Sequence, residues 1–409
     1  MSDVSKPRIL ILTRVYPPVR ASSGRLAREL ARALARDDFK VRVITTDQAA
    51  LSDMDGPVDL HRIACTAERI SVLGGLYMVM RLFWAGLFAP RADVLITLSD
   101  PPLLGLAGFF VSKIRRMRHI HWVQDVYPDL LPVAGVKMPP ELYNILYRLS
   151  RVAMNRADRV VVTGRCMKSY LEKHGARSDR LTYIPAWPER AMSIHQQSMS
   201  GCAATDEQDD RLPSPTILDD VPKFRVLHVG TVGFGHPVAT ILDAATILES
   251  MHPEIEFIFI GNRAAQTQIM GEKTRRGLSN IRILPFQPQS RLRDIMESGD
   301  IHILSMAHEA AELMAPAKLY AALAAARPCV LVGPDEGDAA QLIRDFGAGS
   351  VVPQGAAQAL AQVIIDYRLQ EKLWFSAHDG AMKAAAAYPA EDLLKNWAQL
   401  IQDIVHEKA

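Results

Sequence analysis

The sequence lacks the features that mark several protein classes. Its 409 residues include only four cysteines, at positions 65, 166, 202 and 329, with no C-x-x-C pair and no histidines at zinc-ligand spacing. This pattern argues against a disulfide framework or a zinc site and fits a reducing compartment. The apolar run near the N-terminus, Ile9–Thr13, is too short for a signal peptide. We therefore expect a cytoplasmic protein.

The chain also lacks a strong excess of charge of either sign. Its net charge is +2, so it has no basic excess for coating nucleic acid, and we expect no nucleic-acid partner. The total conceals an asymmetry, because residues 1–190 hold 29 Lys and Arg against 18 Asp and Glu, a net +11, and the rest carries −9. With 49% hydrophobic and 22% charged residues, the composition excludes a wholly disordered chain. The basic half predicts a binding surface in the first part of the chain.

No uninterrupted apolar run is long enough for a clear membrane span. The stretch Ser71–Pro90 carries Arg81 near its middle, and Pro101–Val111 is short and precedes the basic run Lys113–Arg118. A spanning helix needs about 20 apolar residues, and a central arginine costs about 2.5–3.5 kcal/mol on insertion scales. Two interpretations remain open. The helices could pack on a soluble sheet, or they could dip into the cytoplasmic leaflet while basic residues meet anionic headgroups.

Short apolar strands alternate with helical segments along most of the chain. This pattern predicts an α/β fold with parallel, doubly wound sheets. The expected strands are Arg8–Thr13, Lys40–Thr45, Val94–Leu98, His119–Gln124, Arg159–Thr163, Arg180–Pro185, Phe224–Gly230, Glu256–Gly261, Ile281–Pro285, Ile301–Ser305, Cys329–Gly333 and Gly349–Val352.

The alternation is interrupted once, which divides the chain into domains. Residues 188–222 are polar, rich in Ser, Asp and Pro, and lack periodicity, so we expect a linker or surface loop there. This predicts two Rossmann-like domains, residues 1–187 and 223–389, meeting across a cleft. A C-terminal helix, residues 390–409, could pack back on the first domain. In such sheets, ligands bind outside the carboxyl ends of the strands.

The best candidate for a phosphate site follows the first strand of the second domain. Gly230 and Gly233 would let backbone amides approach a pyrophosphate at the following helix, and His236 would add a donor. The loop is not a G-x-G-x-x-G, so a dinucleotide fingerprint is not met, and tight packing alone could explain the glycines. A second cluster contains Glu312 and Lys318, which could bind sugar hydroxyls and a leaving phosphate or could be solvated surface charges.

The first domain offers two candidate sites. Asp125 directly follows a buried strand and could act as a base, bind an acceptor hydroxyl, or simply cap the next turn. The loop after the first strand places Ser22 and Ser23 where the backbone could approach a ligand. The following helix is expected over about Gly24–Arg36, and its face of Arg25, Arg28, Arg32 and Arg36 could bind an acceptor or be a solvated basic stripe.

At these residues the chain resembles a known family, the retaining glycosyltransferases of family four, which have the GT-B architecture. The resemblance spans nearly the whole chain, from ILILTRVYPP and WVQDVYPD through IPAWPE to HVGTVGFGHP, FIFIGN and APAKLYAALAAARP. It is strongest with the branch that builds bacterial surface polysaccharides, similar to the colanic-acid fucosyltransferase and N-acetylfucosamine transferase type. The resemblance implies an enzyme of class EC 2.4 that acts in exopolysaccharide, capsule, lipopolysaccharide or O-antigen synthesis.

The resemblance also implies what binds where. The second domain would bind a UDP- or GDP-linked sugar donor, and the first would bind a lipid-linked saccharide acceptor. The protein itself would be peripherally associated with the inner leaflet of the membrane, where such an acceptor lies. Transfer would retain the anomeric configuration. The implied donor-binding residues are Gly230, Gly233, His236, Pro285, Phe286, Leu313, Met314 and Asp338; the catalytic ones are Asp125, Glu312 and Lys318; and the acceptor-binding ones are Ser22, Ser23 and Arg25.

The chain departs from the family pattern at several positions. The family's Glu-x7-Glu pair falls near Leu313 and Ala321, so Glu312 is the candidate for the first glutamate and Asp338 for the second. The family's basic pair is absent from TVGFGHP, and no Asp-x-Asp appears in a plausible donor loop. We therefore expect no metal and no cofactor, with Lys318 and helix termini stabilising the leaving diphosphate.

Two other functions stay open from the sequence. The incomplete glutamate pair would suit a non-catalytic GT-B scaffold subunit of a polysaccharide assembly complex. A nucleotide-sugar 2-epimerase would use a similar architecture, although it would not need the apolar stretch Ser71–Val111.

Overall fold

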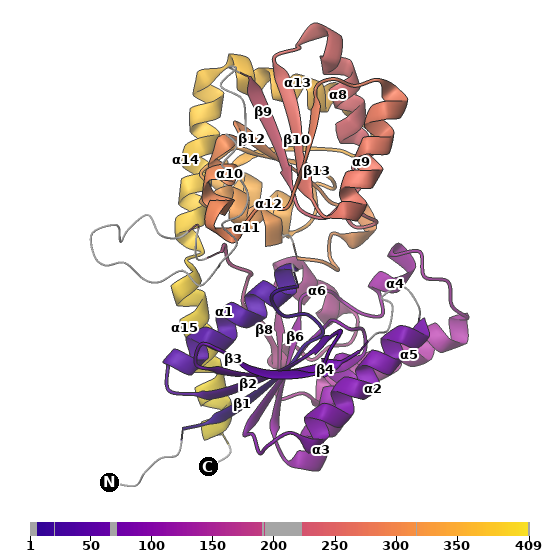
Figure 1. Ribbon diagram of the computed structural model, residues 1–409, viewed down its shortest axis with the longest axis vertical. Helices are drawn as coiled ribbons and strands as arrows, with labels where there is room; N and C mark the ends of the chain where they lie inside the picture. Colours follow the sequence, from indigo (N-terminus) through magenta and orange to yellow (C-terminus); the bar gives the residue numbers. More distant parts are fainter. Residues whose placement is uncertain are drawn as a thin grey trace. The chain divides into compact units, whose positions relative to one another are not determined.

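The computed structural model describes residues 6–19, 21–65, 72–189, 192, 223–315 and 317–407 (Figure 1). These residues form two compact units. Unit 1 takes in the described residues up to 186, together with 309–315 and 391–407, and unit 2 takes in those of 187–308 and 317–390. The linker expected at residues 188–222 lies outside the described residues, apart from 188, 189 and 192.

Unit 1 is built on an eight-stranded sheet with the order β3-β4-β2-β1-β5-β6-β7-β8. Its pairs are parallel except for β3 and β4, which are antiparallel. The strands are β1 (Arg8–Leu12), β2 (Lys40–Asp47), β3 (Leu51–Asp55), β4 (Val58–Ala64), β5 (Val94–Leu98), β6 (Arg118–Val123), β7 (Arg159–Val162) and β8 (Leu181–Tyr183). The helices are α1 (Ser22–Arg36), α2 (Val72–Phe88), α3 (Leu104–Arg115), α4 (Leu130–Val133), α5 (Pro140–Arg156), α6 (Arg165–Lys173) and α15 (Ala390–His406).

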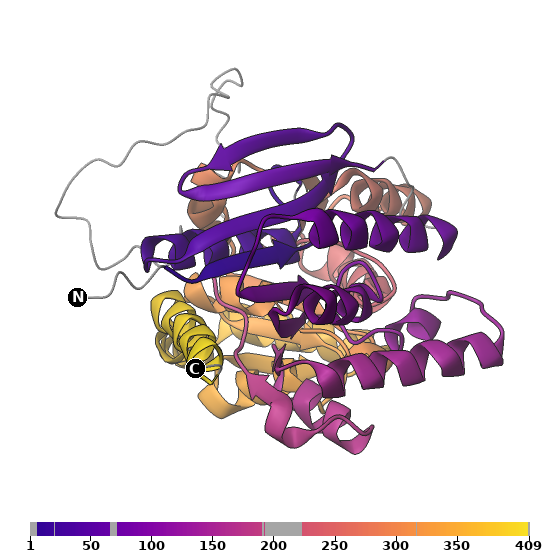
Figure 2. The ribbon, with the colours of Figure 1, turned by 90° about the horizontal axis from the view of Figure 1, so that it is seen from below.

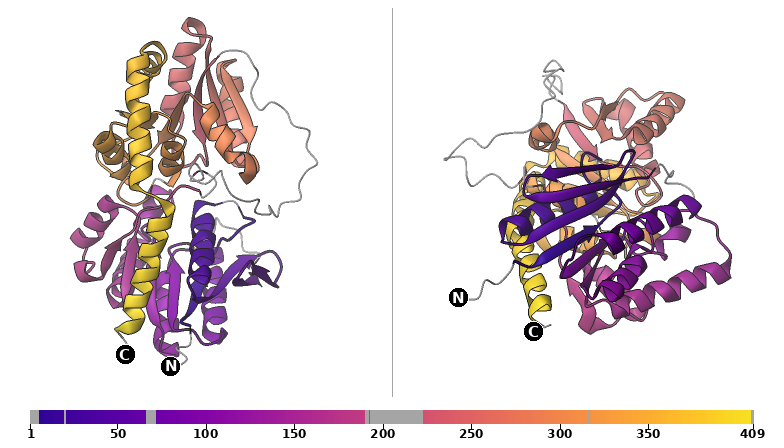
Figure 3. Two further views of the ribbon diagram at one scale, coloured as in Figure 1. Left: turned by 90° about the vertical axis from the view of Figure 1, so that its left-hand side faces the viewer. Right: turned by 60° about the horizontal axis from the view of Figure 1, so that its bottom comes forward.

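Helices cover both faces of this sheet, as the contacts of two neighbouring residues of strand β6 show. Neighbouring residues of a strand point to opposite faces. His121 faces Gly105 of α3, whereas the ring of Trp122 packs against Trp397 of α15 with centroids 4.8 Å apart. Helices α2, α3 and α5 lie side by side (Figures 1 and 2), and α15 runs along the strands of unit 1 (Figure 3). The fully buried strand β5, VLITL, is typical of a parallel sheet covered on both faces.

The hairpin of β3 and β4 at the sheet edge was not expected from the sequence. Strand β3 is almost entirely exposed and mixes Leu51 and Met54 with Asp53 and Asp55, so it has no apolar periodicity. Gly56, at φ +63°, makes the turn between the two strands. Tyr16, Arg28 and Arg32 all bond to the Asp55 carboxylate, which ties the hairpin to α1.

Unit 2 is built on a six-stranded parallel sheet with the order β11-β10-β9-β12-β13-β14. The strands are β9 (Phe224–Val229), β10 (Ile255–Gly261), β11 (Ile281–Pro285), β12 (Ile301–Ser305), β13 (Cys329–Val332) and β14 (Gly349–Val352). The helices are α8 (Ala239–Met251), α9 (Arg263–Arg276), α10 (Leu292–Ser298), α11 (Ala317–Ala324), α12 (Asp338–Phe346), α13 (Ala357–Leu369) and α14 (Glu371–Ala387). Both units therefore have the expected α/β, Rossmann-like architecture.

The segment Glu309–Ala315 leaves unit 2 and returns to it. The segment was expected in the second domain from the sequence, but it belongs to unit 1 by its contacts. The backbone N–H of Val126 donates to the carbonyl of Leu313 at 2.9 Å, and the N–H of Ala315 donates to the carbonyl of Gln124 at 3.3 Å. These bonds fix the segment beside the loop that follows β6. No helix in the described part of the chain is long and apolar enough to cross a membrane.

Candidate functional site

In unit 2, a lysine lies across the glycine that follows β9. Gly230 has φ +129°, and a Cβ there would lie 2.4 Å from Cε of Lys318. The absence of a side chain at Gly230 therefore makes room for Lys318, whose Nζ donates to the carbonyl of Thr231 at 2.7 Å. Because Lys318 is the second residue of α11, its ammonium lies near the N-terminal end of that helix. This places a cation beside the glycine loop expected to hold phosphate.

Desolvation lowers the pKa of Lys318 to about 7, from the usual 10.5. The half-buried ammonium has one carbonyl partner among the described residues, so an anionic ligand would bring it a further favourable partner. In the absence of such a ligand, about half of the Lys318 side chains are neutral near pH 7. The site therefore favours a ligand that supplies negative charge.

His236 is held in one tautomer by the end of β12. Its Nδ1 lies 2.7 Å from the carbonyl oxygen of Ser305, which can only accept, so Nδ1 donates. Desolvation and then the charge of Lys318 lower the pKa of His236 to about 3, and the ring is neutral. In a neutral ring with a proton on Nδ1, Nε2 is an acceptor. From the sequence, His236 was expected to donate to phosphate, whereas in the structure its ring proton is directed to the carbonyl of Ser305.

The other expected donor-side residues of unit 2 lie in different surroundings. Gly233 forms a tight turn with His236, whose N–H donates to the Gly233 carbonyl at 3.0 Å. Phe286 packs against the cluster that contains Leu227 and Ile260, just after the exposed Pro285 that ends β11. Asp338 is the first residue of α12.

In unit 1, polar residues follow three adjacent strands. Arg14 comes after β1, Asp100 after β5 and Asp125 after β6. The carboxyl ends of parallel strands meet at one edge of a sheet. Nε of Arg14 donates to Asp100 at 2.7 Å, and the two side chains form an ion pair. Ser99 accepts hydrogen bonds from the N–H groups of Gln124 and Asp125, at 3.1 Å each, which fixes the loop after β6.

Asp125 is the most perturbed carboxyl group of unit 1. Desolvation, together with the negative charge of Asp100, raises its pKa to about 7. Such a carboxyl can accept a proton or a hydrogen bond near neutral pH, as expected for a group that orients a hydroxyl. Of the open interpretations, the structure does not place Asp125 at a helix N-cap, because the next helix, α4, begins at Leu130.

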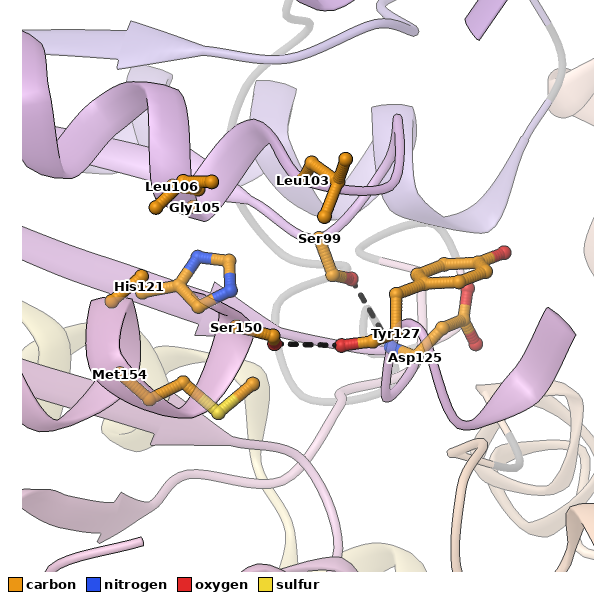
Figure 4. A pocket seen from close by; sticks show the side chains of 10 residues that line it. Ser99, Leu103, Gly105, Leu106, His121, Asp125, Tyr127, Ser150 and Met154 are labelled. Atoms are coloured by element: carbon orange, nitrogen blue, oxygen red, sulfur yellow. Dashed lines mark hydrogen bonds between the residues drawn. The ribbon is translucent and has the colours of Figure 1, made fainter. Parts of the chain in front are cut away.

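Asp125 also lines a pocket in unit 1, with an empty volume of about 320 Å³ including its mouth (Figure 4). Its lining comes from the end of β5, from β6 and the loop after it, and from α3 and α5. The residues are Ser99, Leu103, Gly105, Leu106, His121, Asp125, Tyr127, Ser150, Ala153 and Met154.

The remaining expected residues do not all join these sites. Glu312 is exposed, whereas Leu313 is buried and Met314 half-buried, and all three lie in the segment of unit 1 that pairs with Gln124–Val126. Ser22 and Ser23 form the first turn of α1, not a loop, because the helix begins two residues before the expected start. Arg25 pairs with Glu29 at 3.2 Å.

Sequence reasoning missed Arg14, Ser99, Asp100 and Tyr127. Each lies within four residues of the carboxyl end of a buried parallel strand, and that position was the available signal. Among the described residues, no group of three or more His, Cys, Asp or Glu side chains is placed to hold a metal ion.

Two known protein families match separate parts of the chain. Residues 23–187 match the "Glycosyl transferase 4-like domain" family, and residues 223–368 match "Glycosyl transferases group 1". The chain is a glycosyltransferase with the GT-B fold. As a glycosyltransferase it falls in class EC 2.4. The two matches cover parts of unit 1 and unit 2, respectively.

Named relatives of this glycosyltransferase include WcaI of Escherichia coli strain K12, whose name describes a colanic acid biosynthesis glycosyl transferase. It is 23% identical over 381 residues, which is 86% of this chain and 90% of WcaI. Similar solved structures include HepE of Anabaena in complex with UDP-glucose, with a TM-score of 0.67 at 16% identity over 97% of this chain and 99% of that one. WaaG, described as a glycosyltransferase involved in lipopolysaccharide biosynthesis, has a TM-score of 0.68 at 16% identity over 96% and 99%.

Proposed function

We propose that this glycosyltransferase moves a sugar from a nucleotide-sugar donor to a polyprenyl-diphosphate-linked saccharide during surface-polysaccharide synthesis, with retention of anomeric configuration. The observation that carries the proposal is Lys318, a desolvated cation lying across Gly230 at the carboxyl edge of the unit 2 sheet. A nucleoside diphosphate is the anion that suits such a lysine and glycine loop. The UDP-glucose bound to HepE and the polysaccharide names of WcaI and WaaG support this assignment.

The residues of each unit have separate roles in this reaction. Lys318 and the backbone amides near Gly230 stabilise the departing diphosphate, and no metal ion is needed for that charge. Asp125 accepts a hydrogen bond from the acceptor hydroxyl and orients it for attack. The leaving phosphate takes the hydroxyl proton as the sugar bond forms on the face that the phosphate leaves. The resemblance to fucosyl- and N-acetylfucosaminyltransferases stays a prediction about the sugar.

A panel of UDP- and GDP-sugars in a thermal-shift assay tests donor binding. We expect one nucleotide class to raise Tm, and we expect Lys318→Met to abolish that rise while the variant remains folded. As a control, Lys395→Met removes an exposed lysine of α15 in unit 1 and should leave the rise intact. Failure of every nucleotide sugar to raise the Tm of the unaltered protein would contradict the proposal.

We further propose that the protein works at the cytoplasmic membrane surface through helices α2, α3 and α5. Their outer sides expose large apolar residues, among them Phe88 at 78% exposure. The set is Leu76, Tyr77, Met80, Trp84, Phe88, Phe110, Ile114, Leu142, Ile145, Leu149 and Val152. Neither α2 nor α3 contains an acidic residue, and Arg81 and Lys113 are exposed on them. Apolar groups with a basic fringe suit an anionic leaflet.

Flotation of the full chain with vesicles tests this membrane face. We expect binding to phosphatidylglycerol-containing vesicles and a fall of about tenfold or more in the double variant Trp84→Ser/Phe88→Ser, because two aromatic rings lose their lipid contact. A matched double variant in unit 2, Leu369→Ser/Phe375→Ser, also removes two exposed apolar residues and should bind normally. Equal loss in both variants, or no vesicle binding at all, would contradict the membrane assignment.

A further inference from the structure

The pocket beside Asp125 has a specific polar pattern that the transfer reaction alone does not explain. It lies between α3 and α5, two helices of the proposed membrane face, and all its lining residues belong to unit 1 (Figure 4). At one side is the imidazole of His121, between Gly105 and Leu106 above it and Met154 below it in the view of Figure 4. His121 is only 6% exposed.

His121 presents a hydrogen-bond acceptor to this pocket. Its Nδ1 lies 3.1 Å from both the carbonyl oxygen and the hydroxyl oxygen of Thr97. The carbonyl can only accept, so we assign the proton to Nδ1, which donates it there, and the Thr97 hydroxyl is left to donate to Nε2 of His119, 2.9 Å away. Burial lowers the pKa of His121 to about 4, which keeps the ring neutral and leaves Nε2 as an acceptor. Within the described residues, Nε2 has no hydrogen-bond partner. A ligand N–H or O–H that replaces water at Nε2 would supply this hydrogen bond.

Ser99 presents a donor to the same pocket. Its Oγ already accepts two backbone N–H bonds, from Gln124 and Asp125, so both lone pairs are used and its own proton remains to be donated. The walls between these two polar groups are apolar and include Leu103, Leu106 and Met154. Besides the Asp125 carboxyl and the hydroxyls of Tyr127 and Ser150, the pocket thus offers the His121 acceptor, the Ser99 donor and an apolar surface.

The charge of the pocket excludes acidic ligands. None of its ten lining residues is Lys or Arg, and the Asp125 carboxyl lies on its lining, so a carboxylate or phosphate would find no partner. A hydroxymethyl group would leave the apolar wall unmatched, and a bare methyl group would leave His121 and Ser99 unsatisfied. An acetamido group has one N–H, one carbonyl oxygen and one methyl group, which match the three features together.

We propose that this pocket binds the acetamido group of the acceptor sugar and so selects 2-acetamido sugars over their 2-hydroxy counterparts. The inference rests on the proposed glycosyltransferase function and adds the class of its acceptor. The acetamido N–H donates to Nε2 of His121, the Ser99 hydroxyl donates to the acetamido carbonyl, and the methyl group packs on Leu103, Leu106 and Met154. The hydroxyl to be glycosylated then lies at Asp125.

The test compares acceptors that differ only in this group. The full chain is given farnesyl-diphosphate-linked N-acetylglucosamine or glucose, and N-acetylgalactosamine or galactose, with the nucleotide sugar that supports transfer. We expect kcat/KM to be about tenfold to a hundredfold higher for an acetamido acceptor than for its 2-hydroxy counterpart, since the latter leaves buried polar groups unpaired. Equal kcat/KM within each pair would overturn this inference but not the proposed function. No transfer to any of the four would overturn both.

A variant that fills the pocket provides a second readout. Ala153 lies on α5, is 3% exposed and lines the pocket, so Ala153→Leu adds bulk where the acetamido methyl would lie. We expect the preference for acetamido acceptors to fall toward one in this variant. Asn144→Ala, at an exposed position of the same helix outside the pocket, should keep the full preference. An unchanged preference in a folded Ala153→Leu protein would contradict the assignment of the pocket.

Discussion

Nucleotide binding should draw a proton onto Lys318. Desolvation holds the pKa of this lysine at about 7 in the free protein, and a bound diphosphate would pair with the ammonium and raise that pKa. At pH 8 about one tenth of the free protein carries the proton, so binding should take up about 0.9 proton; at pH 6 it should take up about 0.1. Proton uptake on binding is thus a direct signature of Lys318 in the site.

The same linkage sets the pH dependence of affinity. If only the charged lysine binds the diphosphate, affinity falls as the free-protein lysine loses its proton, by about fiftyfold between pH 7 and pH 9. Because burial lowers the lysine pKa to about 7, the neutral form dominates above pH 7. Nucleotide binding must then protonate the lysine, and this costs affinity as the pH rises. The nucleotide itself contributes little there, because its terminal phosphate titrates near pH 6.

Isothermal titration calorimetry in buffers of different ionisation enthalpy measures this proton uptake. At pH 8, titrations with UDP in phosphate and in Tris should give heats that differ by about 0.9 times the difference in buffer ionisation enthalpy. Lys318→Arg is the matched variant, because arginine stays protonated at this pH and should bind with no proton uptake. Buffer-independent heats for tight binding to the unaltered protein would refute the account of Lys318.

Three further predictions concern other parts of the chain. Gly230→Ala should weaken nucleotide affinity at least tenfold, because its Cβ would lie 2.4 Å from Cε of Lys318. Gly271→Ala, whose Cβ would have no atom within 4 Å, should leave the affinity unchanged, and Kd values from calorimetry test both variants. The acid limb of the pH–rate profile is expected near pH 7, and Asp100→Asn should lower it by about half a pH unit or more, because the variant removes the charge that helps raise the pKa of Asp125. An unmoved limb would exclude Asp125 as the titrating group. Trp397→Ala should destabilise unit 1 by about 3–5 kcal/mol, visible as a lower Tm, because the ring is fully buried against Trp122, while the exposed Trp84→Ala should change Tm little.

The regular part of the fold could be predicted because its strands are continuous apolar runs. Strands such as Val94–Leu98 are buried on both faces, so each appears in the sequence as a run of consecutive apolar residues. The hairpin strand Leu51–Asp55 could not be predicted, because an exposed edge strand needs no apolar periodicity. The start of α1 at Ser22 was also missed, since no capping side chain marks it.

The candidate site could be predicted only in part, because its properties depend on contacts between distant residues. The positions of Lys318 and Asp125 follow from the ends of strands and the starts of helices. Their perturbed pKa values could not be predicted, because they depend on burial of Lys318 against Gly230 and on the negative charge of Asp100 near Asp125. Likewise, nothing local to Glu309–Ala315 reveals that it pairs with the loop after β6.

The proposed reaction is retaining transfer of a sugar from a nucleotide donor to a lipid-linked acceptor. The most direct measurement incubates the full chain with the nucleotide sugar found in the binding panel and a farnesyl-diphosphate-linked acceptor, and reads the anomeric coupling constant of the product by NMR. We predict a product with the anomeric configuration of the donor, formed at least about a hundredfold more slowly by Lys318→Met and Asp125→Asn. Absence of a transferred sugar, an inverted anomeric centre, or full activity in both variants would contradict the account.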